Sequence, residues 1–459
     1  MKIGISFFVT CLIALCSSVV AEPLSLSLTE CIRLGVSRNL HLLNQRLEHD
    51  ETKFDIEIAK KIFIPEVKFQ IDKARNVQDL FEYQSSISGR ALDGTKLDLN
   101  VAGKTDGVSN VNHSRTYSVV LNRPLLRGFG RRVTGIDVDL NKLDYEIALE
   151  LFRSEMNSFI AKLADLYYDL YFDLENLRVQ EQAYQRAQKQ FEDTKHDIEM
   201  GVIPEQEIYL VEENVVEFEI KKESAKRDIS YTELEIRNLL NLDPGDEISI
   251  RASDSLEIRK NETLDFSKSL EILRNCNPNF KIKNLYLRKS QMNTDFYRNQ
   301  LLPILDFQVE YNFQRGPKNY ERDTYNAGFL YEFPLSRSSR DAEFKKSKFE
   351  VRKSEVAVQD VETSMGYDLR KLYLDIEFQK NVFQAKGKAR ELSQKKLDAE
   401  MEKYRNGIST LADIVRFQRE LENSTIDEIQ TQILLNKYYI ERLLLEGTLY
   451  KEFGIDIAS

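Results

Sequence analysis

Two runs of alternating residues, 305–314 and 325–334, constrain the fold of this chain more than any other feature. In both runs the odd positions are apolar or aromatic up to the closing Pro334. The even positions are mostly polar, with Leu330 as the clear exception. Because side chains alternate faces along a strand, each run predicts a strand with one apolar and one polar face. The polar, turn-rich segment 315–323 between them predicts a hairpin.

A soluble β-sandwich would produce the same alternation. The flanks of this hairpin, however, are long helical patterns rather than further strands. Each run has about ten residues, the length that a tilted strand needs to cross a bilayer. We therefore predict a membrane-crossing hairpin, with the apolar face toward lipid and the polar face toward a water-filled lumen. The expected lipid-facing residues are Phe307, Val309, Tyr311, Phe313, Tyr325, Phe329, Tyr331 and Phe333.

The same block of sequence occurs earlier in the chain, because Pro303 follows Pro65 by 238 positions within matching surroundings. At this offset, residues 29–70 align with residues 267–308 without a gap. Identical pairs include Asn39 and Asn277, Leu47 and Leu285, and Phe69 and Phe307. An internal repeat of this length indicates that one structural unit occurs twice, and this determines how the whole fold is interpreted. We therefore divide the chain into two repeats, residues 22–242 and 266–459, joined by a polar linker, residues 243–265.

Each repeat opens with a predicted helix. In the first repeat Thr29 is the expected N-cap, helical character runs to Lys61, and Pro65 stops the helix. The β-hairpins are expected at about 66–124 and 304–334. The first hairpin holds a polar, glycine-containing segment, 74–115, which we interpret as an outward loop with short strands of its own near 97–101.

A long helical hairpin is predicted after each β-hairpin, at about 131–242 and 342–453. The first helix of each has a continuous apolar stripe with coiled-coil-like spacing. At 1.5 Å per residue, each of these helices would be roughly 100 Å long. Each ends at a glycine followed by Pro or Ser and Thr, the expected chemistry of a turn between helices. The predicted tips are Gly201, Val202, Ile203 and Pro204 in the first repeat, and Gly407, Ile408, Ser409, Thr410 and Leu411 in the second.

Four membrane strands per chain are too few for a barrel, since about eight is the practical minimum. An open sheet edge in lipid leaves backbone groups unpaired, so several copies must share one barrel. Charged residues make up 31% of the chain, which keeps the helices out of lipid and predicts a water-exposed tube. The fold class is therefore an α+β membrane protein with two tandem repeats.

The N-terminus is typical of a secretory signal peptide, residues 1–21, with an apolar core and a cleavage site after Ala21. A buried first helix is one alternative. A lipoprotein anchored through Cys16 is another, although Leu15 is bulky where a small residue is expected. Of the remaining cysteines, Cys31 and Cys276 are read as small buried side chains, and a bond between them stays open.

Enzyme, cofactor, metal and nucleic-acid functions find no support in the residues. The net charge of −10 disfavours phosphate binding. Gly128-Phe129-Gly130 follows a strand, but Val133 stands where a dinucleotide-binding motif needs glycine. The glycines are instead expected to let the chain bend sharply between strand and helix. The four histidines are scattered and show no metal-binding spacing.

Three motifs follow one another along the chain: residues 28–32 at the start of a helix, 123–130 between strand and long helix, and 404–414 at a helix-hairpin tip. In this order they make the chain similar to the TolC-type outer-membrane efflux proteins, also called outer membrane factors. The resemblance covers essentially the whole mature chain and implies an outer-membrane homotrimer. It implies one shared twelve-stranded barrel and an α-helical periplasmic tunnel, closed at the periplasmic end.

The resemblance also implies partners and a function. Periplasmic adaptor proteins would dock on the tips and connect the channel to an inner-membrane pump or transporter. The chain would then be the exit duct of a tripartite efflux pump or a type I secretion system, embedded in outer-membrane lipid. A periplasmic coiled-coil adaptor or structural protein without a pore is the alternative. An adaptor would need glycine- and valine-rich β domains between its helices, where this chain has alternating hairpins.

The resemblance points to Asp413 and Arg416 as candidates for the pore constriction. In the family, acidic residues of the second tip narrow the closed end, and Asp413 matches the first of them. The second acid, three residues on, is replaced by Arg416, which puts the usual double ring in doubt and could pair with Asp413 between protomers. Three Asp413 side chains near the axis would bind cations. The alternative is that Asp413 only stabilises a helix N-terminus.

Overall fold

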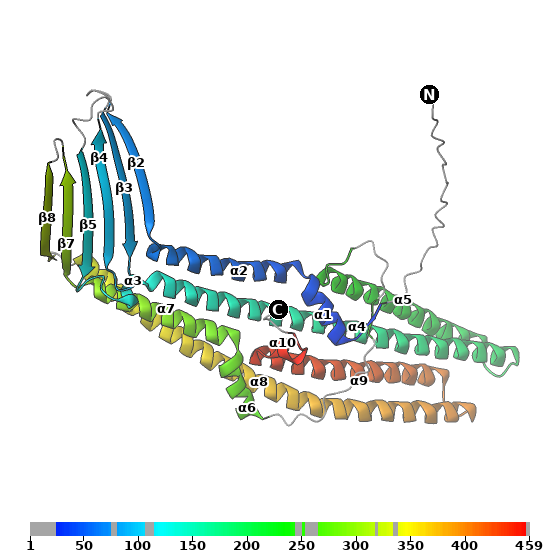
Figure 1. Ribbon diagram of the computed structural model, residues 1–459. Coiled ribbons are helices and arrows are strands. Elements are labelled where there is room, and N and C mark those ends of the chain that lie inside the picture. The colour runs from blue at the N-terminus through cyan, green and yellow to red at the C-terminus, as the bar shows by residue number, and fades with distance from the viewer. Residues whose placement is uncertain are drawn as a thin grey trace, which may run out of the picture. The chain divides into compact units, whose positions relative to one another are not determined.

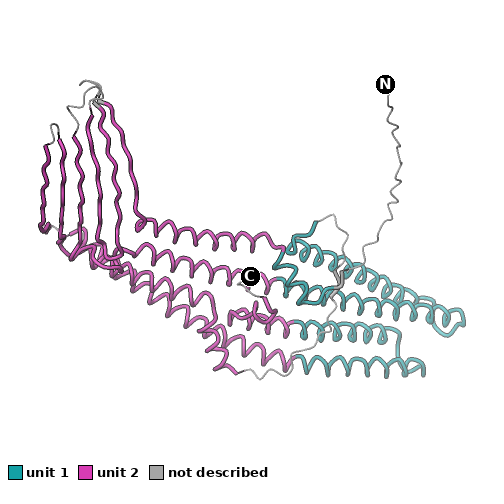
Figure 2. The backbone as a smooth tube through the Cα atoms, viewed as in Figure 1, with its two compact units in different colours: residues 1–37, 163–258, 383–433 teal, residues 38–162, 259–382, 434–459 magenta. Residues whose placement is uncertain are grey.

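The computed structural model describes residues 24–74, 80–105, 114–243, 250–252, 265–316, 320–333 and 338–455 (Figure 1). The predicted signal peptide and most of the predicted linker lie outside these ranges. The chain forms two compact units (Figure 2). Unit 1 comprises 1–37, 163–258 and 383–433, and unit 2 comprises 38–162, 259–382 and 434–459.

The helix predicted at the start of each repeat is broken in two. The pieces are α1 (Leu28–Arg38) and α2 (Leu40–Lys60), followed by the short η1 (Lys61–Phe63), and later α6 (Phe266–Cys276) and α7 (Pro278–Gln300). The breaks fall at Asn39 and Asn277, whose extended backbones start a new helix. Each asparagine side chain accepts a hydrogen bond at 3.0 Å from the backbone N–H three residues on, as N-caps do.

Thr29 is not the N-cap of α1, so that prediction was wrong. Ser27 is, because its Oγ accepts a bond from the Glu30 N–H while the Glu30 carboxylate accepts one from the Ser27 N–H. This reciprocal capping box satisfies two backbone donors that the helix leaves open. Asp265 caps α6 in the same place, accepting from the N–H groups of Ser267 and Lys268.

One antiparallel sheet in unit 2 contains six strands in the order β2-β3-β4-β5-β7-β8. They are β2 (Glu66–Ala74), β3 (Leu80–Arg90), β4 (Lys96–Thr105), β5 (Ser114–Pro124), β7 (Ile304–Arg315) and β8 (Glu321–Glu332). The expectation of two strands per repeat is therefore wrong for the first repeat. Its supposed outward loop holds β3 and β4, which pair with each other and with both flanking strands.

The long helices follow the sheet strands as predicted. α4 (Ile136–Glu199) is preceded by the one-turn α3 (Arg131–Thr134), and α8 (Ser338–Arg405) has 68 residues. The returning helices are η2 (Glu205–Glu207) with α5 (Ile208–Leu239), and α9 (Leu411–Glu446) with α10 (Leu449–Glu452). Residues of the predicted stripes, among them Met156, Leu163 and Leu369, are buried.

Unit 1 is built from the ends of both helical hairpins. Ala183, Ala187 and Phe218 form a buried cluster between α4 and α5. A second cluster, between α8 and α9, contains Leu397, Ile414 and Leu421. A two-stranded parallel sheet, β1 (Leu24–Leu26) with β6 (Ile250–Ala252), also lies in this unit. Sequence patterning did not predict either of these three-residue strands.

Unit 2 has its own core where α6 packs against α8. Leu273, Met365, Leu369 and Tyr373 are buried there. Ser269 lies beside this cluster, with its hydroxyl 2.6 Å from the hydroxyl of Tyr373 and 2.6 Å from the Glu446 carboxylate. The core therefore joins elements that are far apart in the sequence.

Candidate functional site

The sheet of unit 2 has one apolar face that crosses all six strands. Register places Phe307 opposite Phe329, and Tyr311 opposite Tyr325 with ring centroids 4.7 Å apart. The same face continues onto the other four strands, because odd positions pair with odd positions in every ladder. Side chains on this face are Val67, Phe69, Ile71, Phe81, Tyr83, Ile87, Leu97, Leu99, Val101, Tyr117, Val119, Leu121, Leu305, Phe307, Val309, Tyr311, Phe313, Tyr325, Phe329 and Tyr331.

The opposite face of the sheet is polar. Across the middle of the sheet, Asn100 pairs with Ser118, and Ser118 with Asn312. Lys104 of β4 and Glu82 of β3 form an ion pair at 2.6 Å on this face. A sheet with one mainly apolar face and one mainly polar face can separate lipid from water. The eight predicted lipid-facing residues all lie in or beside β7 and β8, and Phe333, just beyond β8, is half exposed.

The end of the sheet next to α3 is a compact turn region. The chain reverses from β3 to β4 through a turn in which Ala91 donates its N–H to Thr95 O. Gly94 has a φ of +94°, and a Cβ there would lie 2.6 Å from the Gly128 carbonyl. The Gly130 N–H donates to Asp93 O at 3.0 Å. This turn is therefore bonded to the segment that links β5 to the long helix.

The glycines of the Gly128-Phe129-Gly130 motif provide the predicted bend. Their φ angles are +81° and +95°, in the region that favours glycine. The Gly128 N–H donates to the side chain of Asn299 on α7 at 2.9 Å. The motif thus joins the sheet to the helices.

The two predicted tips have the same backbone geometry, and both lie in unit 1. At the first, Gly201 has a φ of +70°, its N–H donates to Ile198 O, and Val202 N–H donates to Asp197 O. At the second, Gly407 has a φ of +71° and makes the equivalent bond to Tyr404 O. This is the Schellman arrangement that ends a helix.

The tips expose apolar side chains at their ends. Val202 is 69% exposed and Ile408 is 76% exposed, whereas Leu411 is buried. Ile203, Pro204, Ser409 and Thr410 complete the turns. Ser409 also stabilises its tip, because its hydroxyl donates to the Glu400 carboxylate. That bond, assisted by a bond from Lys403, lowers the pKa of Glu400.

Asp413 lies in the first turn of α9, and Arg416 lies in the second. The Thr410 hydroxyl donates to the Asp413 carboxylate at 2.6 Å, and the Asp413 N–H returns a bond to Thr410 Oγ1. Arg416 Nη2 lies 2.9 Å from the other carboxylate oxygen of Asp413. Asp413 therefore makes the helix-capping contacts of the alternative interpretation. Its pairing with Arg416 occurs within one chain.

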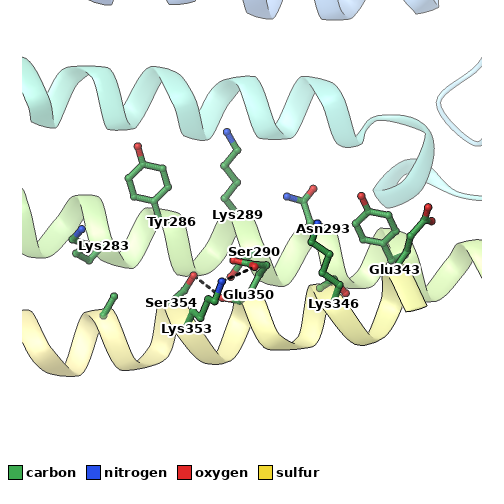
Figure 3. A pocket seen from close by; sticks show the side chains of 13 residues that line it. Lys283, Tyr286, Lys289, Ser290, Asn293, Glu343, Lys346, Glu350, Lys353 and Ser354 are labelled. Carbon is green, nitrogen blue, oxygen red and sulfur yellow. Dashed lines mark hydrogen bonds and ion pairs between the residues drawn. The ribbon is translucent and has the colours of Figure 1, made fainter. Parts of the chain in front are cut away.

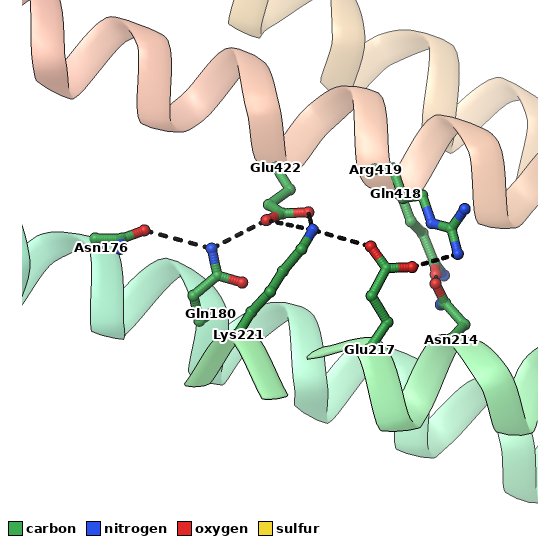
Figure 4. Close-up of polar contacts among 8 residues, drawn as sticks. All are labelled: Asn176, Gln180, Asn214, Glu217, Lys221, Gln418, Arg419 and Glu422. Atoms are coloured by element: carbon green, nitrogen blue, oxygen red, sulfur yellow. Dashed lines mark hydrogen bonds and ion pairs between the residues drawn. The ribbon is translucent and has the colours of Figure 1, made fainter. Parts of the chain in front are cut away.

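A polar network between the two helical hairpins lies in unit 1 (Figure 4). The Glu422 carboxylate of α9 is almost fully buried, with a side-chain exposure of 2%. It accepts bonds from Lys221 of α5 at 2.9 Å and from Gln180 of α4 at 3.0 Å. The charge of Glu422 is thus compensated by residues of the other hairpin.

The network continues along the same two helices. Glu217 of α5 pairs with Lys221 at 3.2 Å and with Arg419 of α9 at 2.5 Å. One turn further, the Asn214 amide donates to the Gln418 side chain at 3.4 Å. This network was not predicted from the sequence. The only signal was that Gln180, Asn214, Gln418 and Glu422 interrupt the apolar stripes of otherwise amphipathic helices.

A groove in unit 2 runs between α7 and α8 and is lined by lysines and glutamates (Figure 3). Lys353 pairs with Glu350 one turn away on α8. Lys289 reaches Asp144 of α4 at 2.6 Å. The first pair lies within α8, and the second joins α7 to α4.

Within the part of the chain that the structure describes, no group of three or more His, Cys, Asp or Glu side chains could hold a metal ion. None of the described helices is both long and apolar enough to cross a membrane.

Comparison with known proteins identifies the fold. No family model and no curated protein matches the sequence. The CmeC outer membrane channel of Campylobacter jejuni has 13% identity and a TM-score of 0.68, over 94% of this chain and 90% of that one. VceC, an outer membrane protein of Vibrio cholerae, has 10% identity and a TM-score of 0.66, over 92% and 96%. The MtrE outer membrane channel of Neisseria gonorrhoeae, in its open state, has 15% identity and a TM-score of 0.65, over 92% and 89%.

The chain therefore has the fold of the TolC-type outer-membrane channels. The likeness extends over more than nine-tenths of its length. This confirms, for the fold, the resemblance that the three sequence motifs indicated.

Proposed function

We propose that the protein is an outer-membrane channel and serves as the exit duct of a tripartite efflux pump or a type I secretion system. The observation that carries this proposal is the two-faced sheet, whose apolar row crosses every strand. None of the described helices that follow it is both long and apolar enough to cross a membrane. Proteins of similar structure include outer membrane channels, which supports the same role.

The edges of the sheet support assembly of several copies. β2 and β8 are the two edge strands of this sheet. On each of them, one row of backbone N–H and C=O groups faces away from the sheet. In lipid such edges are too costly to leave open. Copies arranged head to tail in a ring would close them. We therefore keep the trimer expected from the resemblance, with outer-membrane lipid around the sheet.

The tandem repeat is supported by equivalent positions with equivalent contacts. Ser27 and Asp265, 238 positions apart, both cap the first helix of their repeat. Asn39 and Asn277, at the same offset, cap the second. Local bonding at the same offset supports the proposed division into 22–242 and 266–459.

The tips are the proposed docking site for a periplasmic adaptor protein, which would connect the channel to an inner-membrane pump or transporter. Exposed Val202 and Ile408 support this assignment, because apolar side chains at the ends of charged helices suit a protein contact. Asp413 and Arg416, close to the second tip, remain the proposed constriction.

The experiment is membrane fractionation followed by unheated gel electrophoresis and planar-bilayer recording. A duct will be found in the outer membrane as a detergent-resistant trimer that conducts ions. The rival, a periplasmic adaptor or structural protein, would be recovered without a pore. Recovery of a freely soluble monomer would overturn the channel assignment.

A further inference from the structure

The extra hairpin formed by β3 and β4 lies within the sheet and is not a flap attached to it. β3 pairs with β2 from Ser88 opposite Glu66 to Leu80 opposite Ala74. β4 pairs with β5 from Lys96 opposite Asn122 to Lys104 opposite Ser114. β2 and β5 are therefore separated by two full-length strands.

Both ends of this hairpin match the limits of the sheet. Its turn, residues 91–95, reaches the level where β5 ends at Pro124 and is bonded to Gly130 through Asp93 O. A Cβ on Gly94 would lie 2.9 Å from Pro124 Cγ, so the turn packs closely there. A loop that projected beyond the membrane strands would not be anchored at their helix-proximal end.

The two faces of the sheet continue through β3 and β4. Leu99 lies in one row with Val119 and Tyr311, all apolar or aromatic. The neighbouring row holds Asn100, Ser118 and Asn312, all polar. A one-residue slip would exchange the faces, so this agreement is strong evidence that β3 and β4 face the same two environments as β7.

We propose that the shared barrel has eighteen strands, with all six strands of each of three copies in the membrane wall. This inference rests on the proposed trimeric channel and changes the predicted width of its pore. β2 and β8 run in opposite directions in an antiparallel sheet with an even number of strands. The β8 edge of one copy therefore meets the β2 edge of the next in antiparallel pairing. Because barrel diameter grows roughly linearly with strand number, this barrel would be about 1.5 times wider than a twelve-stranded one.

The first test removes the extra hairpin. Deletion of residues 80–105 leaves 75–79 and 106–113 to connect β2 with β5, whose directions and face patterns suit direct pairing. Native mass spectrometry gives the number of subunits, and projection images of particles in lipid nanodiscs give the barrel diameter. We expect the full-length protein and the deletion variant both to be trimers, with the full-length barrel about 1.5 times wider. Two trimers with barrels of equal diameter would overturn the inference.

A second test uses single cysteines and does not require the deletion variant to fold. Leu99→Cys and Asn100→Cys are compared with Tyr311→Cys and Asn312→Cys, which occupy the same two rows. Cys276 is replaced by serine. Cys31 is completely buried, and burial raises the pKa of its thiol to about 12, so it stays unreactive.

Each variant, reconstituted in liposomes, is treated with a membrane-impermeant maleimide. We expect rapid labelling at 100 and 312 and at least tenfold slower labelling at 99 and 311. Rapid labelling at 99 with protection at 311 would place β3 and β4 outside the bilayer. That result would overturn the eighteen-stranded barrel but not the proposed membrane channel. Rapid labelling at both 99 and 311 would overturn the proposed membrane channel as well.

Discussion

The ammonium of Lys221 lies 2.9 Å from the carboxylate of Glu422 and joins α5 to α9. Glu422 is buried, whereas the Lys221 side chain is about one-third exposed. Removing the carboxylate therefore leaves a partly buried cation without its main partner. Gln180 also loses its bond to Glu422, whereas Glu217 keeps its contact with Lys221.

Glu422→Ala is expected to weaken the packing of the two helical hairpins by about 1.5–3 kcal/mol, the usual contribution of a charged hydrogen bond. Hydrogen exchange in α9 around position 422 should accelerate by about tenfold or more. Glu420→Ala is the control, because Glu420 is exposed and pairs with Lys396 on the surface. Its effect should stay below about 1 kcal/mol. Equal exchange rates in the two variants would show that the buried pair does not hold the hairpins together.

Arg416→Gln tests whether Asp413 faces the pore. It removes the guanidinium at 2.9 Å and leaves the carboxylate bonded to Thr410. If Asp413 lines the constriction, block of single-channel current by Mg²⁺ should strengthen on the order of a fewfold. Asp413→Asn should weaken the block in the same recordings. Unchanged conductance and block in Asp413→Asn would leave Asp413 with its helix-capping role alone.

Gly94→Ala should impair assembly. The residue has a φ of +94°, and the new methyl group would collide with the Gly128 carbonyl at 2.6 Å. The positive φ alone costs an alanine about 1–2 kcal/mol of stability, and the collision with the carbonyl adds to that cost. The measurement is the temperature at which the oligomer dissociates on an unheated gel. Gly89→Ala on β3 is the control, because β3 lies inside the sheet and the new methyl group would meet only the Pro65 side chain, at 3.8 Å. A similar loss in both variants would contradict the role assigned to the turn.

The second tip should loosen in acid. The Ser409 hydroxyl, and then Lys403, hold the pKa of Glu400 below its ordinary value of 4.5. A carboxylate whose pKa is lowered by folding stabilises the folded tip at pH values above its ordinary pKa. This stability is lost as the pH falls through the lowered pKa. Ser409→Ala brings the pKa back toward 4.5, so loosening should begin at a higher pH.

A nitroxide attached at Ile408→Cys reports this change through its mobility between pH 7 and pH 3. Ser424→Ala is a suitable control, because that hydroxyl bonds to the Leu421 carbonyl and to no carboxylate that titrates. If nitroxide mobility changed with the same pH midpoint with and without the Ser409 hydroxyl, that result would argue against this role for Glu400.

Some elements could be predicted because their signals are local. The alternation in β7 and β8 has a period of two residues, and neighbouring side chains alone reveal it. The tips could be located because Gly201 and Gly407 take positive φ angles that other residues avoid. The breaks at Asn39 and Asn277 carried a signal as well, since both residues are strong N-caps and matched at the repeat offset.

The sequence by itself determined a two-faced hairpin, long amphipathic helices and two glycine turns, because each depends on residues close together in the chain. Only the tertiary structure decided that residues 80–105 form two more strands of the sheet, and that Glu422 pairs with Lys221. The glycines and serines of β3 and β4 favour a loop locally, and ladder bonds to β2 and β5 override that preference. The Glu422 partner is 201 residues away, and only the folded chain brings the two charges together.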